Sequence, residues 1–353
     1  MQRRVFSVVG ARPQFIKAAP VERAFQQSAV SNSYLVHTGQ HYDTNMSDVF
    51  FDELRIPAPS FKLNISGGSH GQMTGRMLEA LDQLFIAEKP DGVLVYGDTN
   101  STLAAALAAS KLSIPVFHVE AGLRSFNRVM PEEINRVLTD HVSDLLFCPT
   151  ETAVTNLRRE GLLKGVHAIG DVMQDATQQA AARANEVSTI VKDLGLEGTP
   201  YVLCTIHRAE NTNDLSRLRE LLDYVRATAG TRPIVFPVHP RTRKICEEAG
   251  IGLDGFMPID PAGYLDLQRL INGCELVCCD SGGLQKEAYF HRRPCVTLRD
   301  ETEWVETIDA GWNRLWRTPE YTAPRREIAD YGDGHAADRI VKRIDDWFAS
   351  ADR

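Results

Sequence analysis

The sequence lacks the short motifs that mark several large enzyme classes. It has no GxxxxGKS/T phosphate loop, no GxGxxG dinucleotide motif, no HExxH zinc helix and no GxSxG nucleophile turn. Its ten histidines are scattered, and His37 and His41 are the nearest approach to a metal-binding pair. We therefore expect no metal ion and no bound cofactor.

Paired cysteines are also missing. The seven cysteines include no CxxC pair and are odd in number, and most of them lie in apolar, strand-like runs. Reduced thiols buried in a core explain this pattern better than disulfides or metal ligation do.

Acidic residues outnumber basic ones in this sequence, and long apolar runs are missing. A formal net charge of -8 cannot neutralise a phosphate backbone over a wide face, which argues against nucleic-acid binding. No apolar run is long enough for membrane insertion, and the N-terminal stretch has no small-residue cleavage site. We expect a cytoplasmic protein that binds any phosphate group through a few basic residues at one site.

Short apolar runs alternate with helix-length amphipathic stretches along the whole chain. This alternation is typical of parallel sheets covered by helices, and 353 residues are enough for two cores. We therefore predict an α/β fold with two doubly wound Rossmann-like domains. The expected strands are Val5–Val9, Tyr34–Thr38, Gly92–Tyr96, Val116–Val119, Leu145–Cys148, Tyr201–Thr205, Pro233–Pro237, Phe256–Pro258, Leu276–Cys279 and Cys295–Leu298.

The domain boundary is expected near Gly170, just before a polar, alanine-rich helix over 176–194. The first domain then covers 1–170 and the second covers 171–333, while a terminal helix over 334–353 returns to the first domain. Ligands of such folds bind at the carboxyl ends of the strands, and polar clusters recur at those positions in this chain. The pattern predicts a functional cleft between the two domains.

Cations and carboxylates follow the strands of the first domain. Arg12 and Lys17 lie near the start of a helix, where the free amides and the helix dipole favour an anionic ligand. Asp98 follows the third strand, although a helix-capping role is the competing interpretation. Glu120 ends the fourth strand, where a carboxylate is costly unless it is paired or lies in a cleft.

Glu132 and Arg136 lie in PEEINR at the start of another helix, at i and i+4, so a plain surface ion pair is the alternative there. If Asp98, Glu120 and Glu132 converge, their mutual repulsion separates their pKa values and supplies an acid and a base at one pH.

The second domain supplies basic and small residues after its own strands. His207 and Arg208 lie at a strand-to-helix junction, and His239 repeats this arrangement after the next strand. A third junction carries residues whose backbone amides can cradle a diphosphate, followed by a glutamate that can accept from ribose hydroxyls or lie on an ordinary helix surface. These are Ser281, Gly282, Gly283 and Glu287.

Eight ordered motifs cover nearly the whole chain. They are GARPQFIK, HTGQHYD, GDTNSTLA, HVEAGLRS, PEEINR, HRAEN, DSGGLQKEA and RDETEW. Together they resemble the non-hydrolysing UDP-N-acetylglucosamine 2-epimerase family. The resemblance implies a glycosyltransferase-B-like fold, a UDP-sugar substrate held mainly by the second domain, and a homodimer.

The resemblance also implies a reaction and a set of roles. UDP leaves C1 by anti elimination as the C2 proton is removed, and re-addition returns a proton to the opposite face of a 2-acetamidoglucal. The family's acid–base carboxylates match Asp98, Glu120 and Glu132, although which one removes the proton stays open. Its histidine near the diphosphate matches His207, and its cationic residues match Arg12 and Lys17. The cradle and ribose clamp match Ser281, Gly282, Gly283 and Glu287.

Some positions depart from the family pattern. Gln14 replaces a common glutamate, Lys286 replaces the first glutamate of QEE, and Asp43 stands where allosterically regulated members often carry glutamine. Several motifs look closer to the branch that acts on UDP-2,3-diacetamido-2,3-dideoxyglucuronate. A uronate favours an extra cation, which Arg124 or Arg128 would supply.

Three other functions remain open. A hydrolysing epimerase would release free N-acetylmannosamine, although the RPQFIK motif argues against it. A retaining glycosyltransferase on the same fold would need an acceptor groove, and a UDP-sugar sensor would bind without turnover.

Overall fold

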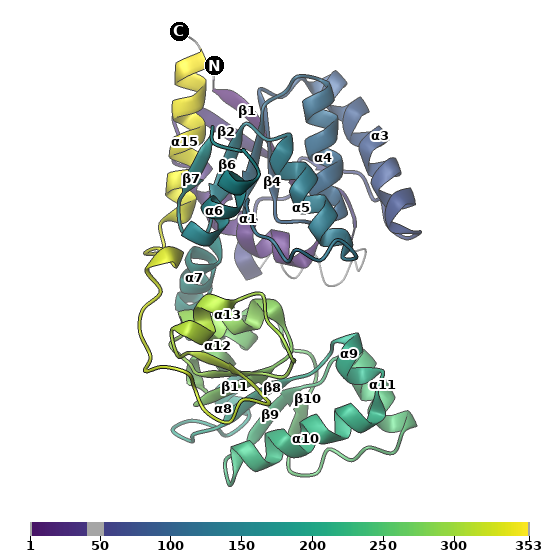
Figure 1. Cartoon of the computed structure of the whole chain (residues 1–353), viewed down its shortest axis with the longest axis vertical. Helices are drawn as coiled ribbons and strands as arrows, with labels where there is room; N and C mark the ends of the chain where they lie inside the picture. The colour runs from purple at the N-terminus through teal and green to yellow at the C-terminus, as the bar shows by residue number, and fades with distance from the viewer. Residues whose placement is uncertain (1, 41–52, 352–353) are drawn as a thin grey trace. The chain divides into compact units, whose positions relative to one another are not determined.

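The computed structural model describes residues 2–40 and 53–351. The chain divides into two units, Met1–Ala176 together with Ala329–Arg353, and Thr177–Ile328. Each unit is built on its own parallel sheet (Figure 1). The assignment of acid–base and UDP-binding roles to these units stays a prediction.

The first unit contains a seven-stranded sheet with the order β3-β2-β1-β4-β5-β6-β7. Every neighbouring pair in it is parallel. The central strands β4 and β5 are buried at every position, as expected for a sheet covered on both faces. The strands are β1 Arg3–Val9, β2 Ser31–His37, β3 Phe61–Lys62, β4 Gly92–Tyr96, β5 Val116–Val119, β6 Leu145–Cys148 and β7 Val166–Ala168.

Helices follow most of these strands, so the carboxyl ends of the strands lead into helix N-termini. Several helices begin at hydroxyl caps, such as Thr99 and Thr150, whose side chains accept from backbone amides three residues on. The helices are α1 Arg12–Phe25, α3 His70–Glu88, α4 Asn100–Lys111, α5 Pro131–His141, α6 Glu151–Arg159 and α7 Val172–Val187, which crosses the division between the units.

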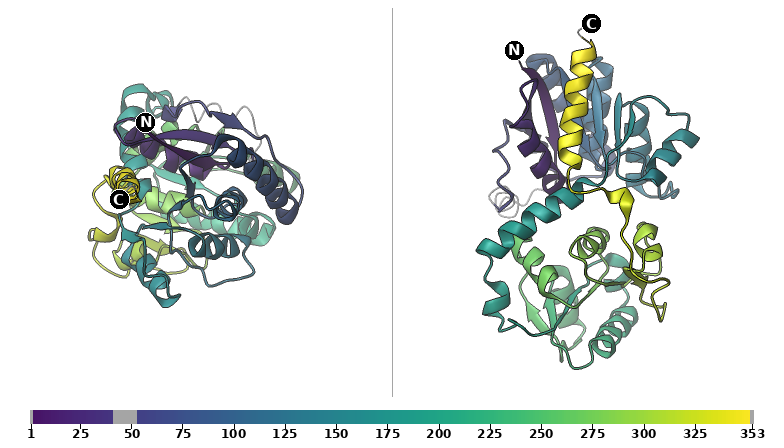
Figure 2. Two further views of the ribbon diagram at one scale, coloured as in Figure 1. Left: turned by 90° about the horizontal axis from the view of Figure 1, so that it is seen from above. Right: turned by 90° about the vertical axis from the view of Figure 1, so that its left-hand side faces the viewer.

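The C-terminal helix α15 (Ala336–Ala351) belongs to the first unit and packs beside α1 (Figure 2). Its Phe348 ring meets Phe117 of β5 edge-on, with 5.9 Å between the ring centroids. Its Asp345 accepts from the Ser28 and Ser31 hydroxyls at 2.7 and 2.5 Å. The end of the chain therefore completes the core of the unit that the chain began.

The second unit contains a six-stranded parallel sheet with the order β10-β9-β8-β11-β12-β13. Its strands are β8 Val202–Thr205, β9 Ile234–Pro237, β10 Met257–Ile259, β11 Leu276–Cys279, β12 Cys295–Thr297 and β13 Asn313–Leu315. Its helices are α8 Ile190–Asp193, α9 Ala209–Thr212, α10 Leu215–Ala229, α11 Pro240–Glu248, α12 Tyr264–Gly273, α13 Gly282–Phe290 and α14 Val305–Asp309. A 3₁₀ turn, Ala329–Tyr331, returns the chain to the first unit.

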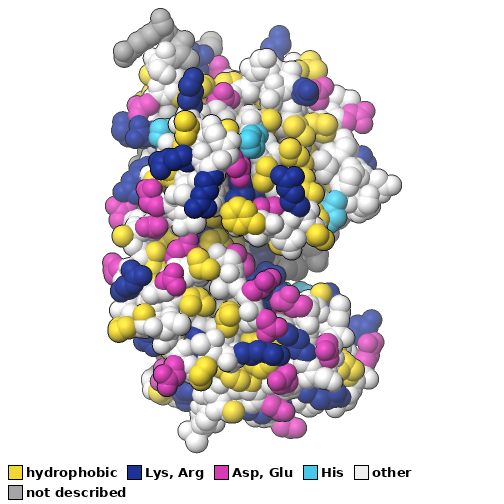
Figure 3. Space-filling view, in the orientation of Figure 1, with side chains coloured by type: hydrophobic (Ala, Val, Ile, Leu, Met, Phe, Trp, Pro, Cys, Tyr) yellow, Lys and Arg dark blue, Asp and Glu magenta, His cyan; other side chains and the backbone are white. Residues whose placement is uncertain are grey.

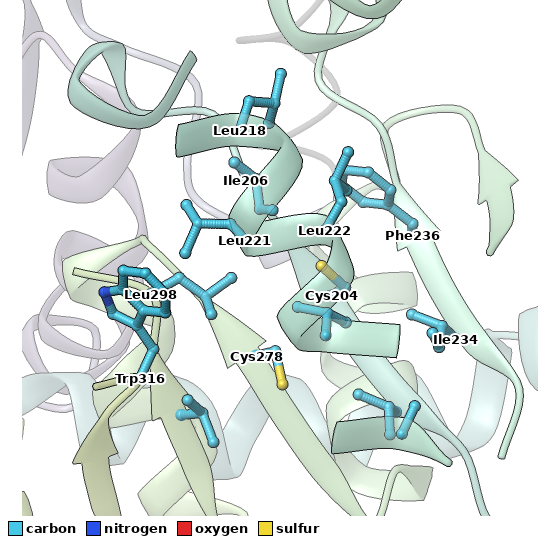
Figure 4. Close-up of a cluster of buried hydrophobic side chains, with 14 of the residues drawn as sticks. Cys204, Ile206, Leu218, Leu221, Leu222, Ile234, Phe236, Cys278, Leu298 and Trp316 are labelled. Atoms are coloured by element: carbon cyan, nitrogen blue, oxygen red, sulfur yellow. The ribbon is translucent and has the colours of Figure 1, made fainter. Parts of the chain in front are cut away.

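One core cluster of the second unit lies between the sheet and α10 (Figure 4). Leu218 and Leu222 of α10 belong to one cluster with Cys204 and Cys278 of the strands, and these four residues are at most 1% exposed. All seven cysteines are buried and unpaired by disulfides. Burial raises the pKa of the Cys204 and Cys278 thiols, so these groups serve as small apolar side chains.

The prediction of two doubly wound α/β units is confirmed, but some elements differ. The structure adds β3, β7 and β13, which are at most three residues long and contain polar residues, so that they carry no apolar signal. The single helix predicted over 176–194 is divided into α7 and α8. The Ser188 hydroxyl lies at this break, where it donates to Asp266 at 2.5 Å.

Candidate active site

Two carboxylates and two cations meet at the carboxyl edge of the first sheet. Lys17 of α1 pairs with Glu120, which follows β5, and Arg136 of α5 pairs with Asp98, which follows β4. The Lys17 and Glu120 side chains are 12% and 11% exposed, so both charges are largely withdrawn from water but remain accessible. The structure therefore brings together four of the residues predicted for this site.

The two ion pairs are electrically coupled. Burial raises the pKa of Asp98; Arg136 and Lys17 oppose this shift, whereas the charge of Glu120 adds to it. Gly97 allows the close approach, because a Cβ atom there would lie 3.2 Å from Glu120 Oε2 and 3.6 Å from Lys17 Nζ. This arrangement can hold one carboxyl protonated beside another that is ionised.

Asp98 is not the cap of α4. Thr99 fills that position, and its side chain accepts from the Thr102 amide. The Asp98 carbonyl accepts from Asn135 Nδ2 at 2.9 Å, so two residues of α5, Asn135 and Arg136, fix Asp98 from the same side. Its carboxylate is thus directed by α5 rather than used to start a helix.

Glu120 has a left-handed backbone, with φ of 71°. This conformation is unfavourable for a residue with a side chain and persists only where the surroundings enforce it. The amides of Glu120 and Ala121 both donate to the Phe147 carbonyl at 3.1 Å. The turn thus holds the Glu120 carboxylate at the edge of the sheet.

Glu132 lies on α5 and is partly exposed, and none of the described residues forms an ion pair with it. The surface pair between Glu132 and Arg136 is absent from the described part of the chain. The neighbouring Glu133 pairs with Arg136 at 3.0 Å and accepts from the amides of Ser125 and Phe126. Glu133 therefore anchors the preceding loop, a role that the sequence analysis missed.

Gln14 is the buried centre of the first motif. Its Oε1 accepts from the amides of Gly10 and Ala11 at 2.8 and 3.0 Å. Its Nε2 donates to the Tyr96 carbonyl and the Thr102 hydroxyl at 2.9 and 3.0 Å. An ionised glutamate could not donate these last two bonds, so the amide suits this position.

Arg12 begins α1 and is partly buried, one and a half turns before Lys17. Arg124 forms two ion pairs within the first unit. Its guanidinium binds Glu160 and Asp140 at 2.7 Å, and the side chain is 1% exposed. Of the two candidates for a cation beside a uronate, Arg124 or Arg128, these ion pairs disfavour Arg124. Arg128 is exposed beside a surface cavity of about 310 Å³ that Phe126 also lines.

In the second unit, His207 is oriented by Asp280. Asp280 is fully buried, and it accepts from the amides of His207 and Arg208 at 2.9 Å. His207 Nδ1 lies 3.1 Å from Asp280 Oδ1, and the ring is 40% exposed. Burial would raise the pKa of Asp280, but its bonds with His207 and other donors lower it. Asp280 thus holds His207 with Nε2 free of any described hydrogen-bond partner.

His239 lies beside this histidine, with 5.7 Å between the two ring centroids. Its Nδ1 accepts from the Arg241 amide at 3.2 Å at the start of α11. The second unit therefore brings His207, Arg208 and His239 into one region.

The third junction is the N-terminus of α13. Ser281 caps the helix, and Gly282 and Gly283 are its first two residues, so their amides have no intrahelical carbonyl partner. A Cβ atom on Gly282 would lie 2.3 Å from Glu303 Oε1, so any larger residue there would require the Glu303 carboxylate to move. Glu287 lies one turn further along and is 5% exposed, so the alternative of an ordinary surface glutamate is wrong.

Both signs of charge occur on one face of the molecule. Lys and Arg side chains are interspersed with Asp and Glu on the face that Figure 3 shows. Within residues 2–40 and 53–351, no group of three or more His, Cys, Asp or Glu side chains could hold a metal ion. No helix among those residues is long and apolar enough to cross a membrane. His41 and Asp43 lie outside the described residues.

The chain was compared with protein families and known structures. Residues 23–345 match the family model described as UDP-N-acetylglucosamine 2-epimerase. The chain belongs to this family.

Relatives of this family match nearly the whole chain. One is the UDP-2,3-diacetamido-2,3-dideoxy-D-glucuronate 2-epimerase of Pseudomonas aeruginosa, 48% identical over 97% of this chain and 99% of that protein. Another is a UDP-N-acetylglucosamine 2-epimerase homolog of Methanococcus maripaludis, 50% identical over 96% of this chain and 98% of that protein.

A solved relative is UDP-GlcNAc 2-epimerase of Methanocaldococcus jannaschii in complex with UDP-GlcNAc and UDP. It is 40% identical with a TM-score of 0.84, and the match covers 97% of this chain and 99% of that one. The predicted family and the glycosyltransferase-B-like class of fold are confirmed.

Proposed function

We propose that this epimerase-family member is an isomerase that inverts C2 of a UDP-linked N-acetylated aminosugar. The observation that carries the proposal is the coupled cluster of Lys17, Glu120, Asp98 and Arg136. The similarity of the chain to 2-epimerases over almost its full length supports the same reaction.

The chemistry explains why such a cluster is needed. The C2 hydrogen of the sugar is not next to a carbonyl group, so its removal cannot be assisted by enolate formation. The electron pair of the C2–H bond instead forms the C1=C2 double bond, while the C1–O bond breaks and its electrons leave with UDP. Re-addition of UDP to C1, with a proton delivered to the opposite face of C2, completes the inversion. The reaction therefore needs a base and an acid near C2 and positive charge near the departing diphosphate.

The cluster provides the acid and the base. The Lys17 ammonium favours the charged form of Glu120, which suits the removal of a proton. The raised pKa of Asp98 favours its protonated form, which suits the delivery of a proton to C2. In the reverse direction the two groups exchange these tasks. Glu132 remains the third candidate carboxyl, and Arg12 a candidate cation.

The second unit provides the groups that bind UDP. The amides at the start of α13 and the helix dipole favour the diphosphate, and His207, Arg208 and His239 add donors. Glu287 is the proposed acceptor for the ribose hydroxyls. A homodimer and a cytoplasmic location also remain predictions, which rest on the resemblance to the family and on the composition.

Exchange of the C2 proton with solvent tests the proposal. The enzyme is incubated in deuterated water with UDP-N-acetylglucosamine and, separately, with UDP-2,3-diacetamido-2,3-dideoxyglucuronate. We expect one deuterium at C2 of a UDP-linked manno product, observed by NMR. The sugar that exchanges faster identifies the substrate, and the identity to the Pseudomonas aeruginosa enzyme makes the uronate the first to test.

Three other outcomes of this experiment would each indicate a different function. Free N-acetylmannosamine as the first product would indicate the hydrolysing reaction. Transfer to an added acceptor without exchange would indicate a glycosyltransferase. Binding of both UDP-sugars without any exchange would indicate a sensor and would exclude the epimerase.

The variant Glu120→Gln separates chemistry from binding. We expect kcat to fall by at least about a hundredfold, because an amide cannot take up the C2 proton, while UDP affinity measured by calorimetry stays within about threefold. Glu79→Gln, an exposed change on α3, is the control. Full activity of Glu120→Gln would remove Glu120 from the mechanism, and the same assay on Glu132→Gln tests the third carboxyl.

A further inference from the structure

His118 lies in β5, two residues before Glu120, and is completely buried. Its Nδ1 lies 2.7 Å from Asp140 Oδ1 of α5, and its Nε2 lies 2.7 Å from the carbonyl oxygen of Gly97. A carbonyl oxygen can only accept a hydrogen bond, and so can an ionised carboxylate. Both contacts are hydrogen bonds at the same time only if both ring nitrogens carry a proton.

Asp140 is ionised in this arrangement. The Arg124 guanidinium is always charged and is 1% exposed, so its position beside Asp140 favours the carboxylate over the neutral acid. Asp140 Oδ2 accepts from Arg124 at 2.7 Å and from the Gly122 amide at 3.1 Å. The other oxygen of this carboxylate, Oδ1, is the one that His118 Nδ1 contacts.

The charged side chains around the pair of His118 and Asp140 have partners of opposite charge. Arg124 is also bound by Glu160 at the end of α6, and His141 of α5 lies 3.3 Å from Glu160. From β6, Cys148 faces Asp140, and burial raises the pKa of its thiol to about 12, so it stays neutral. The Glu120 carboxylate lies two residues after His118, directly beyond the end of β5, where it pairs with Lys17.

We propose that His118 is a buried imidazolium that donates from both ring nitrogens and thereby positions Asp98 and Glu120 for proton transfer. Its Nε2 fixes the carbonyl of Gly97, the residue directly before Asp98. Through Asp140 it fixes the amide of Gly122, two residues after Glu120. One ring thereby ties together the two turns that carry the reacting carboxyls. His118 does not touch the substrate, so it is a positioning residue, and its role rests on the proposed function.

The protonation state is tested directly by NMR on the intact protein with ¹⁵N-labelled histidine. About two pH units above its ordinary pKa, a free histidine side chain is neutral. We expect one ring to retain the signals of an imidazolium with two N–H protons at that pH, and this ring to vanish from the spectrum of His118→Asn. If every ring has one bare nitrogen at that pH, the inference is overturned.

The positioning role is tested with Asp140→Asn, whose amide removes the carboxylate but keeps a similar shape. We expect kcat to fall about a hundredfold, the usual scale for a small misplacement of reacting groups, with KM and UDP affinity within about threefold. The imidazolium signal should disappear in the same variant. The matched control is His335→Gln, which changes an exposed histidine that also lies beside an aspartate, at 3.2 Å.

The outcomes separate the two proposals. A wild-type protein that exchanges no C2 proton contradicts the proposed function, whatever the state of His118. An active wild type with a neutral His118, or an Asp140→Asn variant with unchanged kcat, overturns this inference alone. If His118→Asn does not fold, the wild-type spectrum and Asp140→Asn still decide.

Discussion

Glu22 lies on the buried face of α1, where it accepts from Ser33 Oγ at 2.9 Å. Burial raises the pKa of this carboxyl from 4.5 to about 7, and hydrogen bonds from Ser7 and Ser33 only partly oppose the shift. The group is thus neutral in the folded state at a pH where it is ionised in the unfolded state. Folding stability falls as pH rises from about 4.5 to 7, and the loss is complete above about pH 7.

The variant Glu22→Gln should remove this dependence. Its amide keeps the shape and hydrogen bonds of the neutral acid, so we expect a free energy of unfolding that exceeds the wild-type value above pH 7 by roughly 3 kcal/mol. Below the unfolded pKa the two proteins should be equally stable. Chemical denaturation at both pH values measures the difference, and a difference that does not change with pH would contradict the interpretation.

At the scale of elements, α15 completes the first unit although it comes last in the chain. Phe348 is 5% exposed and packs on Phe117, while Ile340 and Ile344 are fully buried. The apolar side of α15 therefore forms part of the core beneath the β-strands that carry the site.

Truncation of this contact should destabilise the first unit. We expect Phe348→Ala to cost about 3–5 kcal/mol of unfolding free energy, since it leaves a cavity against β5. Lys342→Ala, on the exposed side of the same helix, should cost less than about 0.5 kcal/mol. Denaturant titrations of both variants measure the two values, and equal costs would show that α15 does not contribute to the core.

For the whole molecule, the proposed reaction predicts closure on the nucleotide. A glucal intermediate must be kept from solvent until UDP returns to it, so the two units should approach each other when UDP is bound. We expect a smaller radius of gyration by X-ray scattering in the presence of UDP. Identical profiles with and without UDP would exclude such a closure.

Much of the fold was predictable because its strands are continuous apolar runs. β4, β5, β6 and β11 begin and end at the predicted residues, since they are buried along their whole length. The short strands β3, β7 and β13 gave no such signal. At the break between α7 and α8, Ser188 donates to a distant aspartate, a contact that no local pattern contains.

The sequence by itself determined the alternation of strands and helices and the placement of Asp98, Glu120, His207 and Ser281 after strands, because burial patterns and turn residues are local properties. Only the tertiary structure decided which charges meet. It paired Lys17 with Glu120 across more than one hundred residues, bound Arg124 to buried carboxylates, and enclosed His118 between two acceptors. Such partners are set by the packing of β5 against its neighbours and α5, and spacing along the chain does not encode them.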